Sequence, residues 1–122
     1  MMMRHLGLLL VISSTRAKTP KPQIEIATSK GTLRLELTPD HTPITVDNFL
    51  AYVDASFFDG LIFHRVIKGF MAQGGGFDSN LNEKPALFPP IKLEAATSLS
   101  NTRGTIAMAR TNQPDSATSE FF

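Results

Sequence analysis

The sequence contains no cysteine and no tryptophan, and its charges almost cancel. The absence of cysteine excludes disulfides, thiolate zinc sites, iron–sulfur clusters and cysteine nucleophiles. It leaves the compartment open, because a cysteine-free chain tolerates oxidising and reducing surroundings alike. The formal net charge of +1 argues against a strongly basic nucleic-acid binder. No apolar run approaches the roughly 20 residues of a membrane-spanning helix, so stable membrane insertion is not expected.

The length and composition support one globular domain. A chain of 122 residues fits a single domain and leaves no room for a second catalytic one. Hydrophobic residues make up 42% and charged residues 19%, which is too apolar and too weakly charged for a disordered chain. The composition therefore predicts one hydrophobic core.

The N-terminus has the organisation of an export signal. A short basic start over 1–5 precedes the apolar stretch 6–12, and small residues follow at 14–17. We expect a signal peptide over 1–17 and a periplasmic location, and a cytoplasmic protein is the alternative if this leader is not functional. The proline-containing segment 18–23 predicts a linker, with the domain occupying 24–122.

Two half-buried strands are expected directly after the linker. Ile24 and Ile26 alternate with polar neighbours, and the same alternation returns at Leu33 and Leu35. The turn between them ends at Gly31, where a positive φ would be needed. This pattern predicts an antiparallel hairpin.

An amphipathic helix should follow. Thr42 is a candidate N-cap, and Pro43 suits the first helical position. Apolar residues then recur with the spacing i, i+3, i+4 and i+7, at Val46, Phe49, Leu50 and Val53. This spacing predicts one helix that ends near Ala55.

Shorter strands are expected in the second half of the chain. Segments 61–66 and 70–73 read as strands, and segment 105–109 as another. Residues 78–104 form a long connection without periodicity, and a further strand starts at Glu120. The overall pattern predicts a mainly β fold of the α+β class.

The most informative segment is FHRVIKGFMAQGGGF, residues 63–77. Strand alternation sets His64 and Arg65 on opposite faces unless the strand is bent. Phe70 and Met71 supply apolar surface near Gln73, whose amide both donates and accepts hydrogen bonds. Three consecutive glycines are expected where the backbone needs unusual angles or a close approach. Together these features predict an apolar pocket rimmed by a cation and an amide, which suits a peptide.

Other interpretations of these residues are weaker. Taken alone, His64 would be a structural histidine, Phe70 and Met71 core residues, and Arg65 a surface charge. The glycine run lacks the Lys-Ser/Thr ending of a phosphate-binding loop. The three histidines show no ligand spacing, so we expect neither a metal site nor a cofactor.

Segment 63–77 resembles the signature of the cyclophilins, the peptidyl-prolyl cis/trans isomerases, and is most similar to their exported bacterial members. A second block, NTRGTIAMAR (101–110) followed by DSATSEFF (115–122), resembles the other half of the same site. The resemblance implies a closed eight-stranded antiparallel β-barrel capped by two helices, with a peptide groove on its outer surface. It also implies that the chain lacks the C-terminal part of the domain. We therefore expect these residues alone to fold poorly and to isomerise X-Pro bonds only weakly.

The resemblance assigns roles to residues at matching positions. Arg65 stands for the catalytic arginine, with His64 beside it in the groove and Gln73 as the amide that hydrogen-bonds the substrate backbone. The expected substrate-binding positions are Phe70, Met71 and Phe122 around the proline ring, Ala109 and Arg110 along the peptide, and Glu120. Glu120 departs from the family, which usually has Gln there, and a carboxylate at this place is expected to pair with Arg65.

The implied activity is rotation about X-Pro peptide bonds in unfolded or flexible polypeptides, which assists protein folding. No nucleophile, metal or cofactor is needed for this reaction. A non-catalytic module that binds proline-containing peptides is the alternative. A monomer is expected, and cyclosporin-type compounds are candidate inhibitors.

Overall fold

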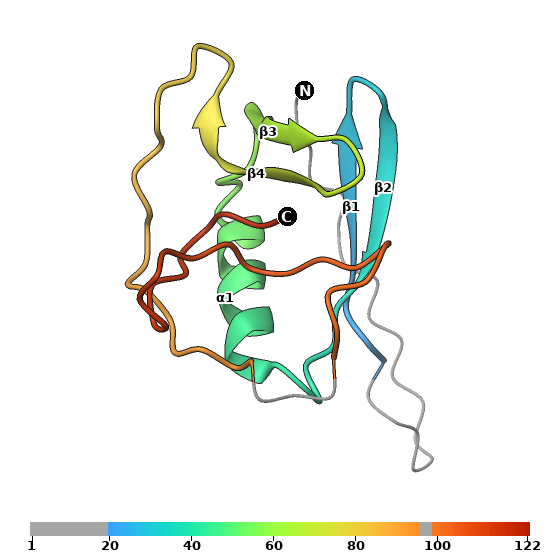
Figure 1. The fold of residues 1–122 in the computed structure, drawn as a ribbon, viewed down its shortest axis with the longest axis vertical. Coiled ribbons are helices and arrows are strands. Elements are labelled where there is room, and N and C mark those ends of the chain that lie inside the picture. The colour runs from blue at the N-terminus through green and yellow to red at the C-terminus, as the bar shows by residue number, and fades with distance from the viewer. Residues whose placement is uncertain (1–19, 96–98) are drawn as a thin grey trace.

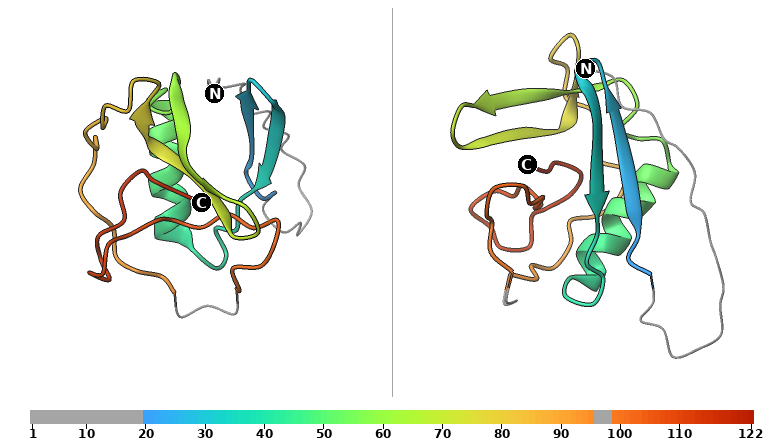
Figure 2. Two further views of the ribbon diagram at one scale, coloured as in Figure 1. Left: turned by 45° about the horizontal axis from the view of Figure 1, so that its top comes forward. Right: turned by 90° about the vertical axis from the view of Figure 1, so that its right-hand side faces the viewer.

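The computed structural model describes residues 20–95 and 99–122, so the predicted signal peptide and the first part of the predicted linker lie outside the described residues. The chain forms a hairpin, a helix and a second hairpin. The elements are β1 (Gln23–Thr28), β2 (Gly31–Glu36), α1 (Pro43–Asp54), β3 (Leu61–Ile67) and β4 (Met71–Asp78). The β1–β2 hairpin runs alongside α1, and the β3–β4 hairpin crosses near the end of the helix (Figure 1). Figure 2 shows the same arrangement from two further directions.

The first hairpin confirms the period-two prediction. β1 and β2 pair antiparallel in one unbroken register from Gln23 opposite Glu36 to Thr28 opposite Gly31. Gly31 has φ +128°, the positive value predicted for the turn. The Thr28 hydroxyl donates a 2.6 Å hydrogen bond to the Gly31 carbonyl, which closes the turn. Local sequence therefore accounts for this whole element.

The helix begins and ends where its pattern predicts, but its N-terminus is capped differently. Thr42 occupies the N-cap position as predicted, but its side chain makes no capping hydrogen bond to α1. Instead the Glu94 carboxylate accepts hydrogen bonds from the backbone N–H groups of Ile44 (3.2 Å) and Thr45 (2.6 Å). The Thr45 hydroxyl donates to the same carboxylate at 2.7 Å. A residue far along the chain thus satisfies backbone donors that the helix itself leaves unpaired.

The second hairpin is longer and less regular than predicted. β4 starts at Met71 rather than Phe70 and continues through the glycine run to Asp78. Its pairing with β3 shifts register twice, between Leu61 and Phe63 and between Phe63 and Arg65. Such β-bulges bend a strand and change the direction of its side chains.

Among the described residues after Asp78, β pairing is limited to isolated bridges. The predicted strand over 105–109 is reduced to a bridge between Met108 and Phe121, and Phe121 also bridges to Gly74. The prolines at 85, 89 and 90 lack the N–H that a continuous ladder needs, which limits pairing in this segment.

The mainly β fold of the α+β class is confirmed, but the closed eight-stranded barrel with two helices is not formed by the residues that the structure describes. These residues form four strands in two separate two-stranded sheets, together with one helix. The isolated bridges of the segments that follow β4 do not involve β1 or β2, so they do not join the two sheets. The described part of the chain also has no helix with the length and apolar character needed to cross a membrane.

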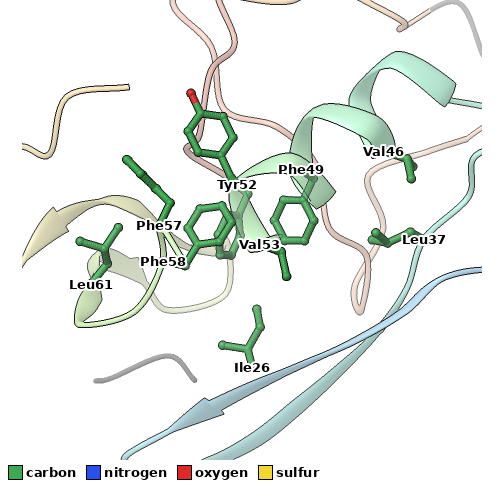
Figure 3. Packing of buried hydrophobic residues seen from close by; sticks show 10 residues of the cluster. Ile26, Leu37, Val46, Phe49, Tyr52, Val53, Phe57, Phe58 and Leu61 are labelled. Atoms are coloured by element: carbon green, nitrogen blue, oxygen red, sulfur yellow. The ribbon is translucent and has the colours of Figure 1, made fainter. Parts of the chain in front are cut away.

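The hydrophobic core lies between α1 and the strands. Figure 3 shows aromatic rings of α1 and of the segment after it facing Ile26 of β1. Val46, Phe49 and Val53 are buried as the helical spacing predicts. The side chains buried most completely are Tyr52, Phe57 and Phe121. Phe121 packs edge-to-face against Phe49 with a centroid distance of 5.6 Å. The end of the chain therefore contributes to the same core as α1.

Candidate active site

A bulge in β3 directs His64 and Arg65 to the same polar cluster. The register shifts between Phe63 and Arg65, so simple alternation does not hold there. Arg65 Nη1 donates a 3.3 Å hydrogen bond to Gln73 Oε1, its cross-strand neighbour on β4. His64 Nε2 lies 3.6 Å from Glu120 Oε2, which is an electrostatic contact rather than a hydrogen bond. The bend that the sequence left open therefore brings both side chains to one site.

Gln73 connects the cation to the carboxylate. Its Nε2 donates a 2.6 Å hydrogen bond to Glu120 Oε2, and its Oε1 accepts the bond from Arg65. Glu120 was expected to pair with Arg65, but among the described residues its carboxylate lies 3.6 Å from His64 Nε2, and its link to Arg65 runs through Gln73. The cluster is thus a chain of four side chains that ends on an exposed guanidinium.

The glycine run of β4 allows segment 119–121 to approach the strand closely. A Cβ atom on Gly75, whose φ is +94°, would lie 2.6 Å from the Ser119 carbonyl oxygen. A Cβ atom on Gly76 would lie 2.5 Å from a carboxylate oxygen of Glu120. The buried Ser119 hydroxyl donates a 2.8 Å hydrogen bond to the Gly75 carbonyl. The close approach expected from three glycines is confirmed, and it is what holds Glu120 in the cluster.

Apolar residues flank this cluster. Ile67 pairs with Met71 two positions from the pair of Arg65 and Gln73, so Met71 shares the face of Gln73. Phe70 lies in the hairpin turn, and 72% of its surface is exposed, so it is not a core residue. Phe122 is half-buried and follows Glu120 onto this face, since the intervening Phe121 is in the core.

Ala109 and Arg110, the positions expected to lie along an extended peptide, make different contacts. Ala109 donates a 2.9 Å backbone hydrogen bond to the carbonyl of Glu120, so it lies beside the cluster. The exposed Arg110 instead donates from Nη1 to the carbonyl of Thr111 at 2.9 Å. Ala109 is therefore tied to the segment that carries Glu120, whereas the Arg110 side chain contacts its own neighbour in the chain.

His64 is held largely by packing. Its ring lies against Phe77 with a centroid distance of 4.4 Å, and only 15% of its side-chain surface is exposed. Its buried Nδ1 has no hydrogen-bond partner. Within the described residues no group of three or more His, Cys, Asp or Glu side chains could hold a metal ion.

Sequence reasoning missed Ser119 and the specific role of Gly76. Both are needed to seat Glu120 against β4. The signal was present as a small polar residue directly before Glu120 and as the last glycine of the run. Neither could be interpreted without knowing that the two segments meet.

Comparison with known proteins supplies the family. Residues 23–122 match the family described as cyclophilin type peptidyl-prolyl cis-trans isomerase/CLD. A peptidyl-prolyl cis-trans isomerase of Acinetobacter baylyi is 51% identical over 117 residues, covering 96% of this chain and 60% of the relative. Peptidyl-prolyl cis-trans isomerase B of Escherichia coli is 52% identical over 95 residues, covering 78% of this chain and 57% of the relative. The chain thus spans about 60% of the length of the curated relatives that it matches.

Solved structures agree. The crystal structure of a cyclophilin from Hirschia baltica aligns with a TM-score of 0.69 at 24% identity, covering 87% of this chain and 58% of that one. A cyclophilin-type isomerase from Cryptosporidium parvum, crystallised in the presence of the dipeptide Ala-Pro, aligns with a TM-score of 0.68 at 28% identity. That alignment covers 82% of this chain and 65% of the other. On sequence and on fold, the chain belongs to the cyclophilin family.

Proposed function

We propose that this protein is a peptidyl-prolyl cis/trans isomerase that rotates X-Pro bonds of unfolded or flexible polypeptides. The observation that carries the proposal is the exposed Arg65 guanidinium, held by Gln73 Oε1 beside apolar side chains on one hairpin. Family membership supports it, because relatives that are about half identical in sequence carry the isomerase name. The Ala-Pro dipeptide used with the Cryptosporidium protein supports a proline-containing ligand here.

Arg65 would donate a hydrogen bond to the amide nitrogen of the X-Pro peptide bond, which rotates and is not broken. Rotation faces a barrier of roughly 18–20 kcal/mol because the nitrogen shares its lone pair with the carbonyl. In the twisted transition state this sharing is lost, and the nitrogen becomes a better hydrogen-bond acceptor. A guanidinium that donates to it is therefore worth more in the transition state than in either ground state, which is the condition for catalysis.

The neighbouring residues would hold the substrate. Phe70, Met71 and Phe122 would receive the apolar proline ring, and Gln73 would hydrogen-bond the peptide backbone. Ala109 and Arg110 would lie along the peptide, with His64 at the edge of the groove. No step of this mechanism requires a metal or a cofactor.

Replacement of Arg65 by alanine tests the proposal. We expect Arg65→Ala to lower kcat/KM for an X-Pro peptide by about 100-fold, since loss of one preorganised donor typically costs that much. The rate is measured by NMR exchange between the cis and trans forms of the peptide. Arg34→Ala is the matched control, because Arg34 lies on the other hairpin and donates to Glu25 far from the cluster.

The same experiment separates turnover from binding. A protein that binds the peptide but leaves its exchange rate unchanged would be the non-catalytic module instead. Equal rates for Arg65→Ala and the unmodified protein would contradict the assignment of Arg65.

We also propose export to the periplasm, on the basic and apolar pattern of residues 1–17. Cell fractionation is expected to recover the protein in the periplasm with its N-terminus near Lys18. Recovery in the cytoplasm with Met1 retained would contradict the proposal.

A further inference from the structure

The charged cluster contains a residue that is distinctive for this chain, Glu120. Its carboxylate, 27% exposed, touches Gln73 at 2.6 Å and lies 3.6 Å from His64. It does not reach Arg65, which instead donates a 3.3 Å hydrogen bond to Gln73 Oε1. Gly76 leaves the space for it, because a Cβ there would lie 2.8 Å from Glu120 Cγ.

The hydrogen-bonding capacities of the three groups dictate one arrangement. A guanidinium can only donate hydrogen bonds, and a carboxylate can only accept them. Gln73 stands between the two, so its amide nitrogen must face Glu120 and its amide oxygen must face Arg65. With glutamine at 120, either end of the neighbouring amide would be a possible partner, and this orientation would no longer be imposed from that side.

We propose that Glu120 is a positioning residue, which acts through Gln73 to orient the Arg65 guanidinium for the reaction. The proposal rests on the isomerase function proposed above and adds to it a residue that need not touch the substrate. The negative charge also polarises the Gln73 amide, which makes Oε1 a better acceptor for Arg65. Only one of the two N–H groups of the Gln73 amide is used by Glu120, so the other remains available to the peptide backbone.

Exchange of the two side chains tests this coupling. Gln73→Glu sets two carboxylates against each other, whereas the double variant Gln73→Glu/Glu120→Gln restores a donor facing an acceptor with the direction reversed. We expect kcat of the double variant to exceed that of Gln73→Glu by about fivefold or more, within the range of coupling between residues in contact. Glu120→Gln alone should lower kcat by about threefold with little change in KM. Glu25→Gln is the matched control, because Glu25 makes an exposed ion pair on the other hairpin.

A second readout does not depend on activity. The Gln73 carboxamide protons, identified by their loss in Gln73→Glu, should include one shifted strongly downfield by the short bond to Glu120. This signal should move upfield in Glu120→Gln and stay in place in Glu25→Gln. The proposal is overturned if the chemical shift of the Gln73 proton does not change in Glu120→Gln. It is also overturned if kcat of the double variant does not exceed kcat of Gln73→Glu, or if Glu120→Gln changes KM and leaves kcat unchanged. If the unmodified protein does not accelerate X-Pro exchange while the carboxamide signal behaves as expected, the proposed isomerase function fails and the orienting contact stands.

Discussion

The two hairpins of this protein are built on the same antiparallel plan and differ in where their partners come from. The β1–β2 hairpin keeps one register throughout, and its ion pairs, Lys21–Glu36 and Glu25–Arg34, are made among residues of the hairpin and its entry. The β3–β4 hairpin shifts register twice, and its polar contacts reach Ser119 and Glu120 more than 40 residues away. The regular hairpin makes its ion pairs close to itself in the chain, and the irregular one carries the candidate active site.

This difference follows from what each hairpin must do. A regular ladder satisfies its own backbone groups and alternates its side chains between two faces. A site that gathers a cation, an amide and a carboxylate needs groups from separate segments, and therefore needs bends, close approaches and distant partners. The bulge at Arg65 and the approach of Ser119 to Gly75 supply these.

The glycines of the two hairpins offer the largest test of this contrast. Gly75→Ala should destabilise the fold by roughly 3–5 kcal/mol, because its φ is +94° and the new Cβ would lie 2.6 Å from a backbone oxygen. Gly31→Ala has a positive φ but no atom within 4 Å of the new Cβ, so only conformational strain of about 1–2 kcal/mol is expected. Urea denaturation of the two variants measures the difference. Equal losses would mean that the approach of segment 119–121 is not a source of stability.

A smaller loss of stability is expected on removal of the hydroxyl group that donates a hydrogen bond to the carbonyl of each glycine. Ser119→Ala removes a buried donor and leaves the Gly75 carbonyl unpaired, at a cost of about 1–2 kcal/mol. Thr28→Ala removes the bond to the Gly31 carbonyl at an exposed site, where water replaces the donor, so a cost of only about 0.5 kcal/mol is expected. Thermal unfolding of both variants checks this order, and a larger loss for Thr28→Ala would reverse the comparison.

The smallest effect extends the contrast to α1, which is also held by a distant residue. Burial alone would raise the pKa of Glu94, but hydrogen bonds from the Thr45 hydroxyl and from the backbone N–H groups of Thr45 and Ile44 outweigh it and lower the pKa below its ordinary value of 4.5. The carboxylate therefore stabilises the fold above pH 4.5, and this contribution is lost as the pH falls through the lowered value.

Glu94→Gln should cost about 0.5–1 kcal/mol at neutral pH, and the deficit should shrink on acidification below the ordinary pKa. The free energy of unfolding of both proteins, measured against pH, checks this expectation. Asp54→Asn, at the exposed end of α1, is a control that leaves the cap intact. A deficit that stays constant with pH would show that the Glu94 charge is not responsible.

Prediction from the sequence succeeded where neighbours along the chain decide the structure. The turn at Gly31, the start of α1 at Pro43 and the burial of Phe49 all depend on residues within a few positions. It failed where a distant residue takes part. The cap of α1 comes from Glu94, and the strand expected over 105–109 needed a continuous partner that Phe121 provides only as a bridge.

The candidate site shows the same division. The motif residues Arg65, Gln73 and Glu120 could be named from the sequence, because their spacing resembles the cyclophilin signature. Their connection could not, since it depends on the bulge in β3 and on the seat that Gly76 provides for the carboxylate. An expected direct pair between Glu120 and Arg65 became a relay through Gln73.

The sequence by itself determined the family, the first hairpin, the helix and the candidate site residues, because these depend on residue type and short-range spacing. The tertiary structure alone decided which groups meet. Hydrogen bonds and close approaches between β4 and segment 119–121 join positions more than 40 residues apart, and no local pattern specifies such a pairing. The orientation of Arg65 is therefore a property of the folded chain, set by one amide between a donor and an acceptor.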